Sequence, residues 1–122
     1  MKKNNKGFSL LELLIVVAII LIIATIAIPS LLRSRQAANE SAAVANLRTI
    51  NTAQVTYLSS SGGNYGNVTA LVTAGLLDTR FNTTVSGYAY TLTASGADYT
   101  ADAAPVSTNT GSIRSRPTMR AA

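Results

Sequence analysis

The 122-residue chain contains no cysteine and no histidine. Without cysteine it can form neither a disulfide framework nor a thiolate metal site. Without histidine it lacks the commonest general base and the commonest metal ligand of proteins. A conventional hydrolase or transferase site is hard to build from what remains, so the sequence predicts no catalytic residues, no metal ligands and no cofactor.

Acidic residues are also few, five against ten lysines and arginines, which gives a formal net charge of +5. Such an excess suggests a nucleic-acid or membrane-surface partner until the positions of the charges are considered. Lys2, Lys3 and Lys6 lie in the first seven residues, and the remaining basic residues are arginines that nearly balance the acids. The positive charge therefore belongs mostly to the N-terminal segment.

Large side chains become scarce after Pro29, where Ala, Thr, Ser, Asn and Gly dominate although 48% of the whole chain is hydrophobic. A chain of this length has room for one small domain and an anchor. We therefore expect a thin soluble core, because a small domain buries only a modest fraction of its surface.

The apolar residues are concentrated in one run, in which every residue from Leu13 to Ile28 except Thr25 is apolar. As a helix, residues 8–28 would cover about 30 Å, the thickness of the hydrocarbon core of a bilayer. A secretory signal peptide would also begin with basic residues, but its apolar region is about 7–15 residues long and ends at a small-residue cleavage site. This run is longer and ends at Pro29, so it indicates a single-pass anchor with its basic end inside.

Glu12 lies within this anchor, and an ionisable residue inside a membrane segment is a functional candidate that needs a partner. A cut between Gly7 and Phe8 would place a new α-amino group at the positive end of the helix dipole, four residues before Glu12. Glu12 could then neutralise that amine on its own chain or on a neighbour.

The run Lys6-Gly7-Phe8-Ser9-Leu10-Leu11-Glu12, the apolar residues that follow and Ala27-Ile28-Pro29 together resemble the class III signal and N-terminal helix of type IV pilins and type II secretion pseudopilins. The resemblance implies that a prepilin peptidase cleaves after Gly7 and methylates Phe8. It implies also that Glu12 pairs with the N-terminal amine of an adjacent protomer, so that Phe8, Glu12 and Pro29 serve assembly.

One residue departs from this pattern. Many pilins have a helix-loosening glycine between the glutamate and the proline, and this chain has Leu21 at the matching place. Pro29 remains, and because an internal proline removes one helical hydrogen bond, we expect a bend near Thr25 to Pro29.

The function that the resemblance implies is that of a structural, non-catalytic subunit of a pilus-like filament for adhesion, motility or DNA uptake. The implied partners are other copies of the chain in a helical filament, the prepilin peptidase, an inner-membrane assembly platform with its ATPase, and the membrane before assembly. The precursor would span the inner membrane once, and the product would be an extracellular pilus or a periplasmic pseudopilus. Two alternatives stay open: a type II secretion pseudopilin, and a membrane-anchored binding module that does not polymerise.

The remainder of the chain predicts an α+β fold, in which one long N-terminal helix packs on a small antiparallel sheet, the ladle-like arrangement of pilin-family proteins. Residues 30–58 read as the amphipathic half of the helix. Its apolar arc, which Gln54 interrupts, consists of Ala43, Leu47, Ile50, Ala53, Tyr57 and Leu58. The predicted division is a leader at 1–7, a membrane and filament-core helix at 8–29, the amphipathic half at 30–58, and a loop and sheet at 59–122.

Within that last region the polar and Gly-rich residues 59–64 predict a loop, and residues 67–77 a short helix capped by Asn67. Alternating residues predict strands at 88–94 and 99–103, joined by a hairpin turn at 95–98. A third strand is expected at 111–116.

Two further groups of residues could form binding sites. Asp98 and Asp102 could contribute to a calcium site, but two acids four residues apart are more often solvated turn residues. Arg114, Arg116 and Arg120 could touch DNA, but stacking on bases needs interleaved aromatic residues, and none follows Tyr99. A solvated basic tail is the favoured interpretation.

Overall fold

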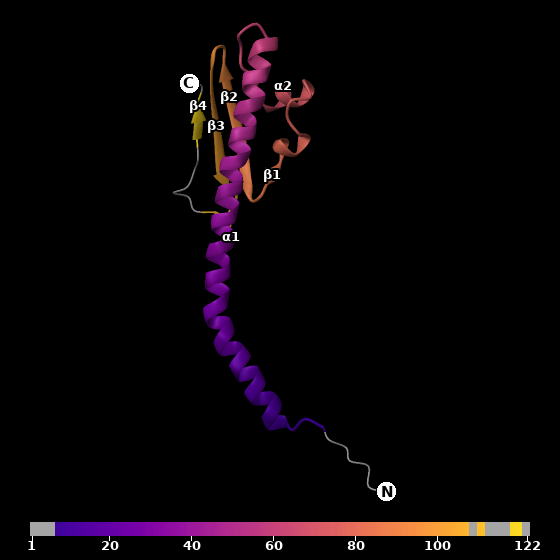
Figure 1. The fold of residues 1–122 in the computed structure, drawn as a ribbon, viewed down its shortest axis with the longest axis vertical. Helices are drawn as coiled ribbons and strands as arrows, with labels where there is room; N and C mark the ends of the chain where they lie inside the picture. The colour runs from indigo at the N-terminus through magenta and orange to yellow at the C-terminus, as the bar shows by residue number, and fades with distance from the viewer. Residues whose placement is uncertain (1–6, 108–109, 112–117, 121–122) are drawn as a thin grey trace. The chain divides into compact units, whose positions relative to one another are not determined.

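The computed structural model describes residues 7–107, 110–111 and 118–120. They form α1 (Leu10–Ser60), α2 (Val68–Thr73), a 3₁₀ helix η1 (Thr79–Asn82) and the strands β1 (Thr84–Val85), β2 (Tyr88–Ser95), β3 (Asp98–Pro105) and β4 (Thr118–Arg120) (Figure 1). One long N-terminal helix and a small antiparallel sheet confirm the predicted α+β class. The helix continues through Pro29 without interruption.

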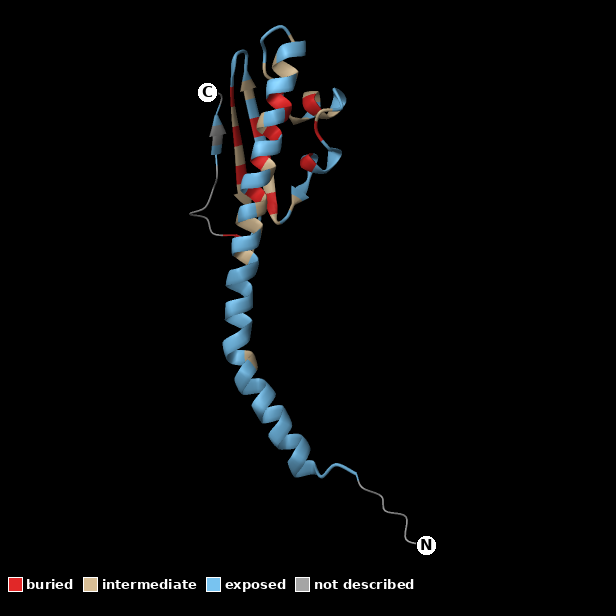
Figure 2. Ribbon diagram, in the orientation of Figure 1, coloured by how far each residue is buried: buried red, intermediate tan, exposed pale blue. Residues whose placement is uncertain are grey.

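The chain divides into two compact units, residues 1–33 and residues 34–122. In the described part of the first unit, residues 7–9 precede α1 and the other residues belong to it. No described side chain of this unit is buried, and all but that of Ala24 are exposed, as the pale blue of this part of α1 in Figure 2 shows. The first unit therefore has no core of its own.

The second unit contains a sheet of order β1-β2-β3-β4, in which all neighbours are antiparallel. The central pair runs from Ser95↔Asp98 to Tyr88↔Pro105, which confirms the predicted hairpin. Gly96 begins its two-residue turn with φ +59°, a backbone conformation that favours glycine. The third predicted strand, at 111–116, lies mostly outside the described residues, whereas β4 pairs with Thr100–Asp102 of β3.

The core of the second unit lies between the sheet and α1. Side chains alternate along β2 and β3, so that Tyr88, Tyr90 and Leu92 of one strand and Tyr99, Ala101 and Ala103 of the other are buried. The helix contributes Ala43, Leu47, Ile50 and Ala53, as its predicted apolar arc requires, and also Gln54, which is completely buried. Figure 2 shows buried residues in red on the upper part of α1 and on the central strands.

The connection from α1 to the sheet contains α2 and η1. Asn67 caps α2 as predicted, because its Oδ1 accepts a hydrogen bond of 2.8 Å from the amide of Ala70. Leu71 and Leu77 are buried, while Leu76 packs against the core from a partly buried position. The sequence patterns did not predict η1, which Asp78 caps, or the two-residue strand β1.

Candidate functional site at the start of the long helix

The start of α1 is held by a reciprocal pair of hydrogen bonds between Ser9 and Glu12. The amide of Ser9 donates to Glu12 Oε2 at 3.1 Å, and the amide of Glu12 donates to Ser9 Oγ at 3.2 Å. This is a capping box, which satisfies two backbone donors that the first helical turn otherwise leaves unpaired. Ser9 was not among the predicted site residues, although the Ser-x-x-Glu spacing before an apolar run is the signal that would have identified it.

The capping box determines what the Glu12 carboxylate can still do. Oε2 is engaged by the Ser9 amide, while Oε1 has no hydrogen-bond partner among the described residues. The carboxylate also lies in the first turn of α1, where the helix dipole favours negative charge. Its chain therefore holds Glu12 in place through one oxygen, and the other oxygen can accept a hydrogen bond from another group.

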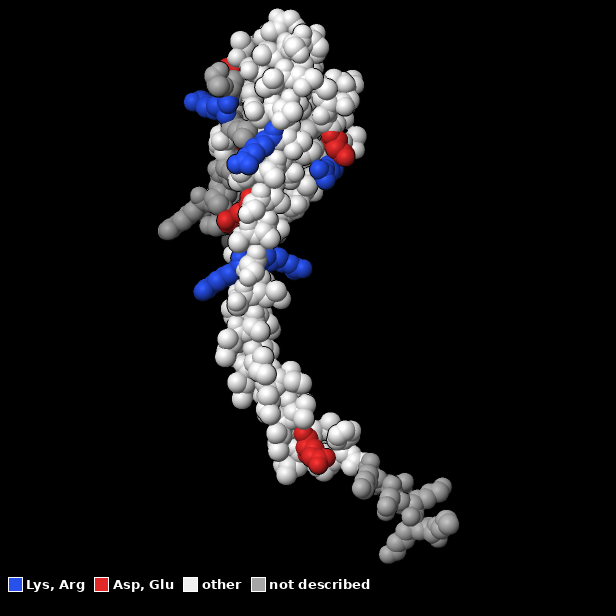
Figure 3. Space-filling model, viewed as in Figure 1, with Lys and Arg blue, Asp and Glu red and all other residues white. Residues whose placement is uncertain are grey.

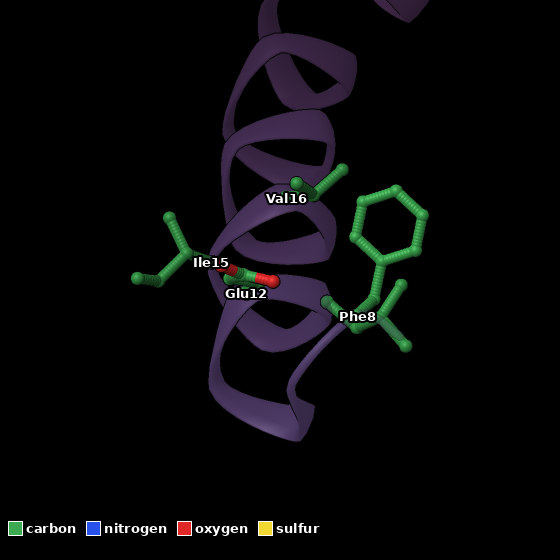
Figure 4. Close-up of a pocket in the computed structure, with 5 residues that line it drawn as sticks. Phe8, Glu12, Ile15 and Val16 are labelled. Carbon is green, nitrogen blue, oxygen red and sulfur yellow. The ribbon is translucent and has the colours of Figure 1, made fainter. Parts of the chain in front are cut away.

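Glu12 lies in an open hollow of about 630 Å³, lined by Phe8, Glu12, Leu13, Ile15 and Val16. Figure 4 shows the carboxylate between Ile15 on one side and Phe8 and Val16 on the other. Phe8 is 85% exposed, and the other four lining side chains are exposed as well. Among the five lining residues that the structure describes, Glu12 carries the one ionisable group and the other four are apolar.

Gly7 lies just before Phe8, outside α1. A Cβ atom added to Gly7 would meet nothing within 4 Å, and its backbone is not in the left-handed region. Neither crowding nor backbone strain within the described chain requires glycine here.

The rest of this surface is apolar and uncovered. Between Glu12 and Arg33 the chain has no charged residue, and Figure 3 shows the corresponding uncharged stretch of α1. By length and composition alone, α1 is suited to cross a membrane. Its large exposed side chains must be covered by lipid or by other protein chains, since burial of apolar surface stabilises proteins and their complexes.

Pro29 lies inside α1 and has no amide hydrogen to donate to the carbonyl of Thr25. One turn earlier, the hydroxyl of Thr25 donates to the carbonyl of Ile22 at 2.7 Å. A second open hollow, of about 430 Å³, is lined by Leu21, Ala24, Thr25, Ile28 and Pro29. The bend expected between Thr25 and Pro29 stays a prediction.

Of the other candidate residues, those that the structure describes lie away from this site. Lys2, Lys3, Lys6, Arg114 and Arg116 lie outside the described residues. Asp98 Oδ1 accepts from the amide of Tyr99, and Asp102 Oδ1 accepts from the hydroxyl of Thr118 at 2.8 Å. Within residues 7–107, 110–111 and 118–120, no three His, Cys, Asp or Glu side chains are grouped so that they could hold a metal ion.

Comparisons with known proteins point to the same segment. The family model described as the prokaryotic N-terminal methylation motif matches residues 2–28. The type IV wide pilus major component PilA4 of Thermus thermophilus is 42% identical over 84 residues, which are 69% of this chain and 64% of that protein. The type IV major pilin protein PilA of Myxococcus xanthus is 47% identical over 56 residues, 46% of this chain and 26% of that protein.

The chain thus spans less than two thirds of the length of either relative. No solved structure matches it. The methylation motif covers the residues that build the site, and both relatives are named as type IV pilus components. By these comparisons the chain is similar to type IV pilins, and its N-terminal segment carries the methylation motif.

Proposed function

We propose that this protein is a structural subunit of a type IV pilus, processed at its N-terminus and polymerised through α1. The observation that carries the proposal is the combination of the methylation motif at residues 2–28 with an apolar helix that its own chain leaves uncovered. The names of the two relatives support a pilus rather than a secretion pseudopilus. In this proposal residues 1–7 are a leader, 8–29 the membrane and filament-core helix, 30–58 its amphipathic half, and 59–122 the globular head.

Processing would consist of cleavage between Gly7 and Phe8 and methylation of the new amine of Phe8. Two features support this position. The bond between Gly7 and Phe8 lies outside α1, before the capping residue Ser9. This position suits cleavage, because a protease needs an extended rather than a helical backbone. No contact or backbone conformation within the described chain requires glycine at position 7, so a requirement of the peptidase would explain this residue.

Assembly would bring the amine of one protomer to Glu12 of the next. Oε1 of Glu12 can accept a hydrogen bond from that amine while Oε2 keeps its hydrogen bond from the Ser9 amide. Transfer from lipid to a filament replaces one apolar environment with another, so packing and polar pairing must drive it rather than exclusion of water. The Glu12 carboxylate supplies such a pairing, and the proposed sites are therefore Gly7 and Phe8 for processing and Phe8, Glu12 and Pro29 for assembly.

The experiment that tests processing is mass spectrometry of the chain purified from membranes and from sheared filaments. The expected N-terminus is a methylated Phe8. A Gly7→Val variant is the matched control, because a Cβ there meets nothing within 4 Å and the chain's own packing is unchanged. Cleavage should be lost in that variant while membrane insertion is kept.

An intact Met1 in the mature membrane fraction would instead favour a membrane-anchored module that does not polymerise. Electron microscopy of the same cells separates the remaining alternatives. Surface filaments labelled by an antibody to the chain are expected for a pilus. Filaments confined to the periplasm would favour a type II secretion pseudopilin.

A further inference from the structure

The part of α1 in the second unit carries a regular seam that faces the sheet. Positions 43, 47, 50, 54 and 57 follow one another at alternating spacings of four and three, as in a coiled-coil heptad. Ala43, Leu47 and Ile50 are buried, and Tyr57 is partly buried against the same core. The remaining seam position is Gln54, the one polar residue among the described residues of the buried core.

Gln54 is bonded at both ends of its amide to one residue. Its Nε2 donates to the carbonyl of Gly66 at 2.6 Å, and its Oε1 accepts from the amide of Gly66 at 3.1 Å. A Cβ on Gly66 would lie 2.9 Å from Tyr57 Cε1 and 3.1 Å from Ala70 Cβ. The close approach of this backbone to α1 therefore needs glycine, and it brings two buried backbone groups within reach of one side chain.

Three asparagines of α1 make similar bonds to three other segments. Asn39 Nδ2 donates to the carbonyl of Thr110 at 3.1 Å, beyond the end of β3. Asn46 Nδ2 donates to the hydroxyl of Tyr90 in β2 at 2.9 Å. The hydroxyl of Tyr99 in β3 donates to Asn51 Oδ1.

The apolar side chains of the seam cannot specify this arrangement by themselves. A shift of the sheet by one helical turn, about 5.4 Å, exchanges each seam position for its neighbour, so most of the sheet residues would again meet an apolar seam residue. The same shift would leave the buried amide of Gln54 and the backbone of Gly66 without partners, and folded proteins keep nearly all buried polar groups bonded. It would also break the two partly buried asparagine–tyrosine bonds. A single polar residue in an apolar seam selects the register of coiled coils in this way.

We propose that Gln54, together with Asn39, Asn46 and Asn51, sets the register in which the sheet packs on α1. The four amides connect the helix to the loop before α2, to both central strands and to the segment after β3. In a chain without cysteine, no disulfide can fix the sheet at one position along α1, and these hydrogen bonds fix it instead. This role is separate from the proposed processing and assembly at Glu12.

The test measures the register directly in the full chain in detergent micelles. Because the protein has no cysteine, spin labels can be attached at Ser41→Cys and Thr93→Cys alone, and both positions are exposed. In the sheet Thr93 pairs with Thr100, next to Tyr99, whose hydroxyl reaches Asn51, so the two labels are separated along α1 by about ten residues, or about 15 Å. Pulsed electron–electron double resonance measures the distance between the labels, and a shift of one turn changes that distance by up to about 5 Å.

The main variant carries five substitutions that replace the polar groups by apolar ones. Gln54→Met removes the buried amide, and both partners of each asparagine–tyrosine bond are replaced, by Asn46→Leu with Tyr90→Phe and by Asn51→Leu with Tyr99→Phe. One narrow distance is expected in the parent, and a second, displaced population in the variant. Thr52→Val is the matched control, since the exposed Thr52 hydroxyl bonds only to its own helix at Arg48. The control should keep the single distance of the parent.

A single distance unchanged in the variant would overturn the proposal. The same second population in Thr52→Val would overturn it too, because the shift in distance would then come from a general loosening of the helix. If circular dichroism shows that the combined variant has not folded, Gln54→Met alone is compared with the same control. A second population then supports the proposal, and a single unchanged distance contradicts it.

Discussion

At the scale of single residues, the most informative feature is that the two carboxylate oxygens of Glu12 lie in different surroundings. One carboxylate oxygen caps its own helix through Ser9, and the other is open in an apolar hollow. The capping bonds lower the cost of holding an acid in an apolar environment, because a buried charge without hydrogen bonds is strongly disfavoured. A role in the helix and a role toward a partner can therefore be separated by substitution.

The charge of Glu12 is tested by comparing Glu12→Gln with Glu12→Ala. Glutamine keeps an oxygen for the Ser9 amide but cannot pair with an amine as an ion, whereas alanine loses both functions. We expect both variants to insert in the membrane and to yield at least about tenfold fewer sheared filaments, because each loses the ion pair with the neighbouring amine. Immunoblots of sheared filaments at matched membrane levels measure this yield. The assembly role would have to be abandoned if Glu12→Ala formed filaments as well as the parent.

A second residue-scale prediction concerns Gly111, which is buried beneath Tyr88. A Cβ on Gly111 would lie 2.1 Å from the Tyr88 hydroxyl oxygen and 2.7 Å from Cζ, and Tyr88 itself is completely buried. Gly111→Ala should therefore lower the free energy of unfolding by about 1–3 kcal/mol, as overpacking of a filled core does. Urea unfolding followed by circular dichroism checks this value.

The double variant Gly111→Ala/Tyr88→Phe is the control for that clash. Phenylalanine removes the nearest atom, so the double variant should lose less stability than the sum of the two single variants. Strict additivity of the two changes would show that Gly111 and Tyr88 do not crowd each other.

At the scale of elements, α2 is a six-residue helix, and isolated helices this short are not stable in water. Its stability must come from packing of Leu71 and from the cap that Asn67 provides. The cap is the part that can be removed without opening the core, because Asn67 is exposed.

Asn67→Ala should cost about 1 kcal/mol of stability, the usual value for loss of an N-cap side chain, and Asn67→Asp should retain most of it. Thermal unfolding of the two variants and the parent measures the difference. Asn82→Ala is a useful comparison, since Asn82 is exposed at the end of η1 and is not a capping residue. An equal loss in Asn82→Ala would argue against a specific contribution of the cap.

At the scale of the whole molecule, the globular unit depends on tyrosines that are both core residues and hydrogen-bonding groups. Burial raises the pKa of Tyr90, and the hydrogen bond from Asn46 partly opposes that rise. Burial also raises the pKa of Tyr99, and the neighbouring Tyr65 adds to the effect. The rings of Tyr65 and Tyr99 pack with centroids 4.7 Å apart.

These shifts predict how stability depends on pH. A phenol whose pKa is higher in the folded than in the unfolded state holds its proton more tightly when folded. Its contribution is complete below the ordinary pKa of 10.0 and is lost as the pH rises through the folded value. The free energy of unfolding should therefore fall above about pH 10, a pH that follows from the model-peptide pKa of tyrosine.

Denaturant unfolding at a series of pH values tests this dependence. The variant Tyr90→Phe/Tyr99→Phe should be less stable at neutral pH, because Asn46 and Asn51 lose their partners, but its stability should fall less steeply above pH 10. An equally steep fall in this variant would assign the effect to other groups.

Much of this protein follows from local sequence patterns. The basic start, the apolar run and Glu12 identify the N-terminal segment, because the length, charge and apolarity of a membrane helix need no information about distant residues. The cap of α2, the hairpin between β2 and β3 and the buried arc of α1 were also predicted, since capping residues, turn residues and periodicity are properties of neighbouring positions. Short elements such as β1 and η1 were not, because two to four residues carry too weak a periodic signal.

What only the tertiary structure decided is the meaning of the polar residues on α1. In the sequence Gln54 appears as an interruption of an apolar arc, whereas in the fold it is completely buried and binds Gly66 through both ends of its amide. Asn46 and Asn51 meet tyrosines that follow them by 44 and 48 residues. A polar side chain is stable in a core only when a partner lies at hydrogen-bond distance, and that condition depends on how distant segments of the chain come together.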